Sequence, residues 1–167
     1  MPTVAAVLGD LTKQNVDAIV NAASTAMRGG GGVDGAIHRA AGPGLLEECI
    51  ERFPNGLATG DAGWTTGHDL PARYVIHTPG PNHRAGQRNP ELLKSSYKRC
   101  LEVADDLGVQ TIAFPLISAG VFGWPLDDAI KIAVETLSVT PTKVEQINLV
   151  ALNEDNYSRI QDHLAGF

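Results

Sequence analysis

A run of glycines that leads into a predicted helix, with an acid close behind it, is the feature of this chain best suited to chemistry. Residues 29–32 are four consecutive glycines, Val33 follows, and Asp34 comes next. Because glycine has no Cβ, the backbone N–H groups of such a loop are accessible. A helix N-terminus adds unpaired donors and a partial positive charge. The combination predicts a site for a phosphate group.

The carboxylate of Asp34 has two interpretations. Asp is a common N-cap residue, so Asp34 can serve simply to begin the helix. On the other hand, a carboxylate close to a bound anion is repelled by about 1 kcal/mol even in water, and a site that only binds phosphate gains nothing from it. A hydrolase would use the carboxylate to orient or deprotonate a water molecule. His38 lies one helical turn further on and on the same face, which suits a structural hydrogen bond or support of Asp34.

Two other segments place polar groups directly after apolar runs. Residues 9–12, Gly-Asp-Leu-Thr, form either an Asx-type turn or a carboxylate and amide that match the hydrogen-bonding edge of adenine. Residues 118–125, Ser-Ala-Gly-Val-Phe-Gly-Trp-Pro, form either an ordinary strand-to-helix turn or a second set of backbone amides. In the second interpretation the ring of Phe122 packs on a sugar. Ser118 is not part of a G-x-S-x-G motif, so a serine hydrolase is not supported.

Other motifs carry less weight. Gly30, Gly32 and Gly35 fit G-x-G-x-x-G, but a loop separates them from the preceding strand and no acid-ended second strand follows, which argues against a nicotinamide-binding domain. The two cysteines, Cys49 and Cys100, belong to no CxxC or Cys/His cluster and are expected to be buried, reduced thiols. The five histidines show no metal-ligand spacing, so neither a metal nor a cofactor is predicted.

Apolar runs alternate with helical segments along the chain. Strands are predicted at 4–8, 18–22, 61–66 (antiparallel), 74–77, 111–114 and 146–152, and helices at 33–41, 43–52, 89–107, 125–137 and 155–165. This alternation is typical of a three-layer α/β/α fold with a mostly parallel sheet. Ligands of such folds bind at the carboxyl ends of the strands, so we expect both glycine loops to face one crevice.

The composition limits the class of protein. A chain of 167 residues with 43% hydrophobic content is expected to form a single domain over residues 1–167. A formal net charge of -6 argues against sequence-specific nucleic-acid binding, although backbone amides can bind an anion without Lys or Arg. No signal peptide and no apolar run as long as a membrane span is recognised. We therefore expect a cytoplasmic monomer that does not associate with membranes.

Five segments, in this order, together resemble a macrodomain, and most closely the MacroD-type ADP-ribosylhydrolases. They are residues 9–12, 20–23, 29–39, 69–78, and 113–115 with 118–125. The stretch Gly-Gly-Gly-Gly-Val-Asp-Gly-Ala-Ile-His is specific to that branch, because many other macrodomains lack the acid. The resemblance covers nearly the whole chain. It implies an α/β/α sandwich with a mixed, mainly parallel six-stranded sheet and a crevice for ADP-ribose.

The resemblance also implies a role for each site residue. Asp34 is the acid that hydrolysis requires in the family, and Asn21 holds the distal-ribose side of the first loop. Ser24 stands where the branch usually has a second asparagine near the reacting centre, and it supplies one hydroxyl in place of an amide. Phe122 replaces a common tyrosine. ADP-ribose is expected to contact Asp10, Leu11, Ala22, Gly31, Gly32, Val33, Ser118, Ala119, Gly120, Val121, Phe122 and Asn156, with Asp10, Leu11 and Asn156 at the adenine.

The activity that the resemblance implies is removal of ADP-ribose from glutamate or aspartate side chains of mono-ADP-ribosylated proteins. Deacetylation of O-acetyl-ADP-ribose is the related small-molecule reaction. Two alternatives stay open: a reader module that binds ADP-ribose without cutting it, and an enzyme for ADP-ribose metabolites. Asp34 favours an enzyme, whereas Ser24 gives weight to the reader.

Overall fold

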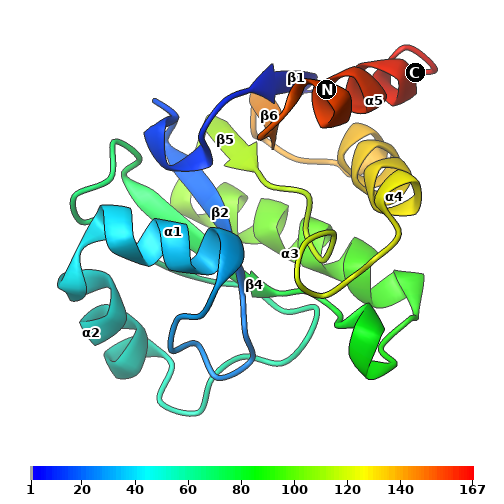
Figure 1. The fold of residues 1–167 in the computed structure, drawn as a ribbon. Coiled ribbons are helices and arrows are strands. Elements are labelled where there is room, and N and C mark those ends of the chain that lie inside the picture. Colours follow the sequence, from blue (N-terminus) through cyan, green and yellow to red (C-terminus); the bar gives the residue numbers. More distant parts are fainter. Residues whose placement is uncertain (1) are drawn as a thin grey trace.

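The computed structural model describes residues 2–167, so Met1, the first residue of the predicted domain, lies outside it. Its centre is a six-stranded sheet (Figure 1). The strands are β1 (Thr3–Leu8), β2 (Ala18–Ala23), β3 (Gly63–Thr66), β4 (Tyr74–Pro79), β5 (Thr111–Phe114) and β6 (Gln146–Ala151). They lie in the order β1-β6-β5-β2-β4-β3, and every neighbouring pair is parallel except β3 with β4. The predicted mostly parallel sheet with one antiparallel strand is confirmed.

Helices cover both faces of this sheet. They are α1 (Gly32–Ala41), α2 (Pro43–Arg52), α3 (Pro90–Leu107), α4 (Leu126–Val139) and α5 (Glu154–Leu164), with short 3-10 helices η1 (Leu11–Lys13) and η2 (His83–Ala85). One apolar core lies under α1 and α2, and a larger one lies under α3, α4 and α5. Figure 1 shows α1 and α2 well apart from α4 and α5. The arrangement is therefore the three-layer sandwich that the alternation of elements predicts.

Successive residues of β2 point to opposite faces of the sheet, as in any strand. Ala18 and Val20 pack into the core under α3 to α5, whereas Ile19 and Ala23 pack into the core under α1 and α2. Asn21 shares the face of Ile19 and Ala23, so strand geometry directs this polar side chain beneath α1 and α2. It is 1% exposed.

Strand β4 is longer than the sequence predicts. It continues past His77 to Pro79, while its antiparallel partner β3 ends opposite His77, at Gly63. Beyond that point β4 pairs with β2 alone, and Pro79 lies opposite Ala23. A proline is tolerated there because no second neighbour needs its missing N–H. Within residues 2–167, no helix is long and apolar enough to cross a bilayer.

Candidate active site

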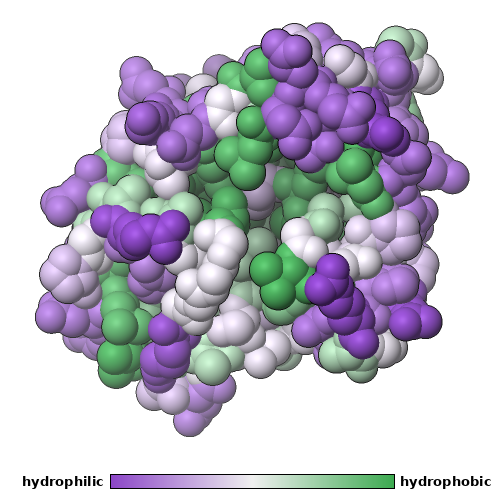
Figure 2. All heavy atoms as spheres, viewed as in Figure 1, coloured by the Kyte–Doolittle hydropathy of each residue, from purple (hydrophilic) through white to green (hydrophobic). Residues whose placement is uncertain are grey.

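A cavity of about 490 Å³ lies at the carboxyl ends of the parallel strands. Its walls come from the turn after β1, the end of β2 with the loop into α1, the loop from β5 to α4, and the end of β6 with the start of α5. Figure 2 shows this hollow with mainly apolar and weakly polar residues inside and hydrophilic residues around it. The volume lies within the range of small-molecule sites, roughly 300–1,000 Å³.

Most of the predicted site residues line this one cavity. They are Asp10, Leu11, Ala22, Ser24, Gly31, Gly32, Val33, Asp34, Ser118, Ala119, Gly120, Val121, Phe122 and Asn156. Asn21 does not line the cavity and lies buried behind Asp34. The two glycine loops therefore face one crevice, as expected. They also approach each other, because a Cβ on Gly32 would lie 3.8 Å from a methyl carbon of Val121.

The first loop ends at the N-terminus of α1. Gly31 is the N-cap residue and has no side chain to cap the helix, so the first backbone amides of α1 stay free of side-chain partners. Gly32 has φ +59°, a conformation that favours glycine. Asp34 is the third residue of α1, so the interpretation of Asp34 as the N-cap is wrong. Its carboxylate instead lies in the first helical turn, where negative charge is stabilised.

The carboxylate of Asp34 is held through one of its two oxygens. The Nδ2 atom of Asn21 donates to Oδ1 at 2.8 Å, and Nε2 of His38 lies 3.4 Å from the same oxygen. A Cβ on Gly30 would lie 3.3 Å from Oδ2, so the neighbouring glycine leaves room there. Asp34 is 5% exposed, lines the cavity, and uses Oδ2 in no hydrogen bond within residues 2–167. This arrangement leaves one carboxylate oxygen available to a water or ligand.

A row of buried polar side chains continues behind Asp34 across three strands. Asn21 on β2 lies opposite His77 on β4, and Nδ2 of Asn21 is 3.1 Å from Nδ1 of His77. On the other side of the ring, Nε2 of His77 is 2.9 Å from Oγ1 of Thr65 on β3. Sγ of Cys49 is 4.0 Å from the same Nε2. This polar row crosses an otherwise apolar layer and ends at the cavity carboxylate.

Burial keeps two of these groups uncharged. Removal from water lowers the pKa of His77 to about 3, so its ring is neutral near pH 7. Burial also raises the pKa of Cys49 to about 11, so its thiol is neither a thiolate nucleophile nor a ready metal ligand. Cys49 and Cys100 are both free and buried, as expected. Among residues 2–167, no three His, Cys, Asp or Glu side chains come together in a way that would hold a metal ion.

The lowered pKa of His77 predicts a loss of stability in mild acid. Below pH about 6.5 the unfolded chain binds a proton at His77 that the folded chain excludes. The titration of His77 therefore leaves the free energy of unfolding unchanged above pH 6.5. As the pH falls from there toward 3, it lowers that free energy by about 1.4 kcal/mol per pH unit. Urea unfolding at pH 7 and pH 5 measures it. Between pH 7 and pH 5 the free energy of unfolding of His77→Asn should fall by about 2 kcal/mol less than that of the parent, and an equal fall would contradict the prediction.

The second loop is strained at Ser118. This residue has φ +66°, is 5% exposed, and has a buried Oγ atom without a partner in residues 2–167. A Cβ on Gly80 would lie 2.4 Å from that Oγ, so Gly80 allows the close approach. Within the same residues no hydrogen bond uses the backbone N–H groups of Gly120, Val121 and Phe122. The loop thus presents free donors, as the amide interpretation requires.

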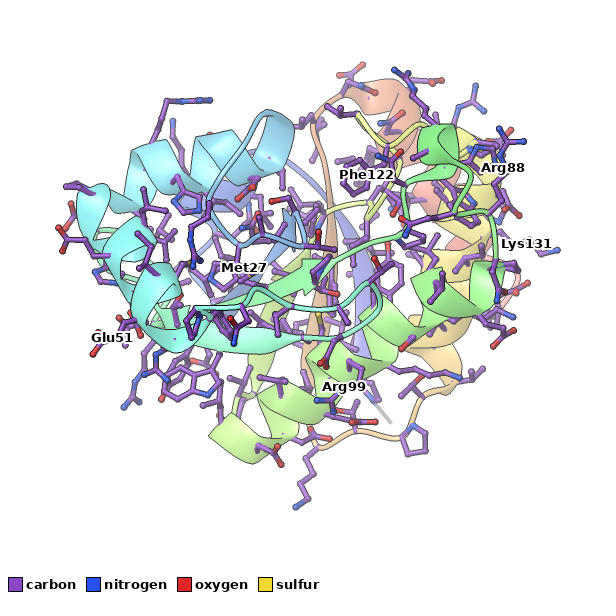
Figure 3. All side chains as sticks on the ribbon, turned by 90° about the horizontal axis from the view of Figure 1, so that it is seen from below. Met27, Glu51, Arg88, Arg99, Phe122 and Lys131 are labelled. Carbon is purple, nitrogen blue, oxygen red and sulfur yellow. The ribbon has the colours of Figure 1, made fainter. Side chains whose placement is uncertain are left out.

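Residues that do not line the cavity support both loops. Arg84 in η2 donates its backbone N–H to the carbonyl of Phe122 at 3.1 Å, and its side chain lies over Gly123. Figure 3 labels Phe122, which belongs to the second loop, and Met27, which belongs to the first. Met27 is 2% exposed and packs into the core under α1 and α2.

The polar groups at the other end of the cavity belong to the turn after β1 and the start of α5. The Oδ1 atom of Asp10 accepts from the backbone N and Oγ1 of Thr12, at 2.9 and 2.7 Å. These hydrogen bonds, chiefly the one from the hydroxyl, keep the pKa of Asp10 below its ordinary value. Asp10 therefore forms the turn that its sequence context predicts and also lines the cavity beside Asn156.

Sequence reasoning missed some of the site. Leu152 and Asn153 line the cavity beside Asn156, and Leu152 is 76% exposed. Asn153 carries a sequence signal that was available, since it is the N-cap of α5 and accepts from the backbone of Asn156. The supporting positions of His77 and Thr65 had no comparable local signal.

A family model described as Macro domain matches residues 20–133 of the chain. The chain belongs to the macro domain family. Full-length similarity supports this: a Macro domain-containing protein of Streptomyces coelicolor is 50% identical over 161 residues, covering 94% of this chain and 95% of its own. An O-acetyl-ADP-ribose deacetylase of Escherichia fergusonii is 49% identical over 162 residues, covering 93% and 91%.

Solved macrodomain structures have the same fold. A macrodomain mutant from Oceanobacillus iheyensis, solved with ADPR, superposes with a TM-score of 0.93 at 39% identity and covers 99% of this chain and 93% of its own. The macro domain architecture predicted from the resemblance is therefore confirmed along nearly the whole chain.

Proposed function

We propose that this macro domain binds ADP-ribose in the cavity and hydrolyses its bond to glutamate or aspartate side chains of proteins. The same site would deacetylate O-acetyl-ADP-ribose. The observation that carries the proposal is the carboxylate of Asp34, which lies at the cavity wall with Oδ1 held by Asn21 and Oδ2 unpaired within residues 2–167. The names of an O-acetyl-ADP-ribose deacetylase and an ADPR-bound macrodomain among similar proteins support it.

The cavity offers a place for each part of ADP-ribose. Asp10, Leu152 and Asn156 would contact the adenine, since a carboxylate and an amide can match its polar edge and an apolar side chain can cover its ring. The diphosphate would lie between the N-terminus of α1 and the free amides of Gly120 to Phe122. The distal ribose would then lie toward Ser24 and Asp34, on the first-loop side of the site.

The reaction that we propose needs only water. Oδ2 of Asp34 orients a water molecule, which attacks the ester that joins the distal ribose to the carboxyl group. The ester C–O bond breaks, the acid is released, and the ribose hydroxyl takes a proton. Backbone amides of the loops stabilise charge as it develops. In O-acetyl-ADP-ribose the same steps release acetate.

Ser24 favours a second candidate function, that of a reader. It lines the cavity where the related hydrolases usually have asparagine, and one hydroxyl replaces an amide there. A site that lacks this amide is compatible with a protein that binds ADP-ribose and leaves the linkage intact.

Two measurements on the unmodified protein distinguish the hydrolase from the reader. Calorimetry with ADP-ribose tests binding. Release of labelled ADP-ribose tests hydrolysis, with a carrier protein modified at glutamate and, as the control, a carrier modified at arginine, whose N-glycosidic bond has no ester carbonyl. We expect binding and release from the glutamate carrier alone. Binding without release from either carrier, and without deacetylation of O-acetyl-ADP-ribose, would leave the reader. Deacetylation alone would indicate a metabolite enzyme.

A further inference from the structure

The amide of Asn21 has two hydrogens and two close partners. Nδ2 lies 2.8 Å from Oδ1 of Asp34 and 3.1 Å from Nδ1 of His77. Asn21 and His77 are 1% exposed and Thr65 is 0% exposed. The row that these three side chains form lies beneath α1 and α2, where the surrounding core is apolar. Buried polar groups in such a layer are costly unless each donor meets an acceptor.

The chemistry of the atoms fixes the direction of each hydrogen bond. A carboxylate oxygen only accepts, so Asn21 must turn its NH₂ group, and not its carbonyl, toward Asp34. The second hydrogen of Nδ2 then points at Nδ1 of His77, which must be the unprotonated nitrogen of the ring. The proton of the neutral ring therefore resides on Nε2 and is donated to Oγ1 of Thr65 at 2.9 Å.

The opposite tautomer of His77 would reverse the direction of the hydrogen bond between His77 and Asn21. A proton on Nδ1 would meet the NH₂ group of Asn21, and the amide would have to turn its carbonyl oxygen toward His77. That rotation would bring the carbonyl, in place of the NH₂ group, toward Asp34, where two acceptors repel each other. In the observed orientation Oδ1 of Asn21 has no partner within residues 2–167, which is itself unfavourable. The two bonds made by Nδ2 must therefore determine the orientation.

We propose that His77 is a positioning residue for hydrolysis: held by Thr65 as the Nε2–H tautomer, it fixes the amide of Asn21, which keeps Oδ1 of Asp34 occupied and Oδ2 directed at the substrate water. This inference rests on the proposed function, because it assigns Asp34 its role there. His38 cannot replace His77 in this role. Its Nε2 atom approaches Oδ1 of Asp34 at 3.4 Å, and this contact does not fix the orientation of the Asn21 amide.

The pair Thr65→Val and Thr65→Ser tests the proposal with little change in volume. Valine removes the acceptor for Nε2–H, whereas serine keeps it. We expect Thr65→Val to lower kcat for release of ADP-ribose from the glutamate-modified carrier roughly tenfold, which is the effect of one lost hydrogen bond. Thr65→Ser should keep most of the parental kcat. The Kd for ADP-ribose should stay within about threefold in both, because neither changes the cavity wall. Equal kcat values for the two variants would overturn the proposal.

The ring nitrogens of His77 report the hydrogen-bond assignment directly and independently of catalysis. In ¹⁵N NMR of the unliganded protein we expect a protonated Nε2 and an unprotonated Nδ1, and in Thr65→Val a gain of the Nδ1–H form. A wild-type ring with Nδ1 protonated would overturn the proposal at once. Because this signal is read without substrate, failure of the proposed hydrolysis is distinguished from failure of the hydrogen-bond assignment.

A second pair guards against variants that fail to fold. His77→Asn can place a carbonyl oxygen near the present Nδ1, whereas His77→Leu supplies no acceptor but suits the apolar layer. A positioning role predicts higher kcat in His77→Asn than in His77→Leu at similar Kd for ADP-ribose. A packing role predicts the reverse order, since leucine fills the core better, and that order would overturn the proposal.

Discussion

An Asp34→Asn variant should bind ADP-ribose normally and lose nearly all hydrolysis. The change keeps the shape of a side chain that is only 5% exposed and leaves an oxygen to accept from Asn21. It removes the negative charge that would orient or deprotonate water. A positioned general base contributes roughly 100- to 10,000-fold, so we expect kcat to fall by at least about 100-fold. Affinity should be unchanged or somewhat higher, because a carboxylate near the diphosphate repels it.

The matched control is Asp106→Asn. Asp106 is exposed on α3, does not line the cavity, and loses the same charge when it is replaced. Release from a glutamate-modified carrier gives kcat, and calorimetry gives the Kd for ADP-ribose. We expect the control to match the parent in both. An Asp34→Asn protein with the parental kcat would remove Asp34 from the mechanism, whereas loss of ADP-ribose binding would show that it has a role in recognition.

Much of the fold follows from local signals in the sequence. Gly42, with φ +85°, and Pro43 separate α1 from α2, and Gly108, with φ +72°, ends α3 where the sequence predicts. Glycine and proline are informative here because each restricts or permits a backbone conformation on its own. The true end of β4 depends on how far β2 pairs with it, since Ala23 lies opposite Pro79, and this is a property of the sheet and not of the residues near Pro79.

The candidate site, too, could be predicted from the sequence only in part. Each loop follows a strand directly, so the rule that ligands bind at strand ends was enough to bring the two glycine loops together. The support of Asp34 could not be predicted in this way. Asn21 and His77 are 56 residues apart and meet only through the register of β2 with β4. The N-cap role considered for Asp34 also depended on where α1 begins, and the N-cap is Gly31, three residues earlier. Helix ends are the least certain part of any helix prediction.

Gly56→Ala should destabilise the protein by about 3 kcal/mol, through a clash that costs about 1–3 kcal/mol and a left-handed backbone that costs about 1 kcal/mol more. Gly56 has φ +73°, and a Cβ there would lie 2.0 Å from the carbonyl oxygen of Thr25. That oxygen also accepts from the backbone N–H of Leu57 at 2.9 Å. Since Thr25 is next to Ser24 at the cavity, the first loop must shift to accommodate the methyl group, and ADP-ribose affinity should fall with stability.

Gly86→Ala provides the comparison that separates the clash from the backbone conformation. Gly86 has φ +92°, and a Cβ there would meet nothing within 4 Å. It should therefore lose only about 1 kcal/mol. Urea unfolding gives both values, and unchanged slopes would show that the denatured states are comparable. Equal losses in the two variants would mean that the contact between Gly56 and Thr25 does not hold the first loop. A larger loss in Gly56→Ala with weaker ADP-ribose binding would tie the position of that loop to a segment outside the cavity.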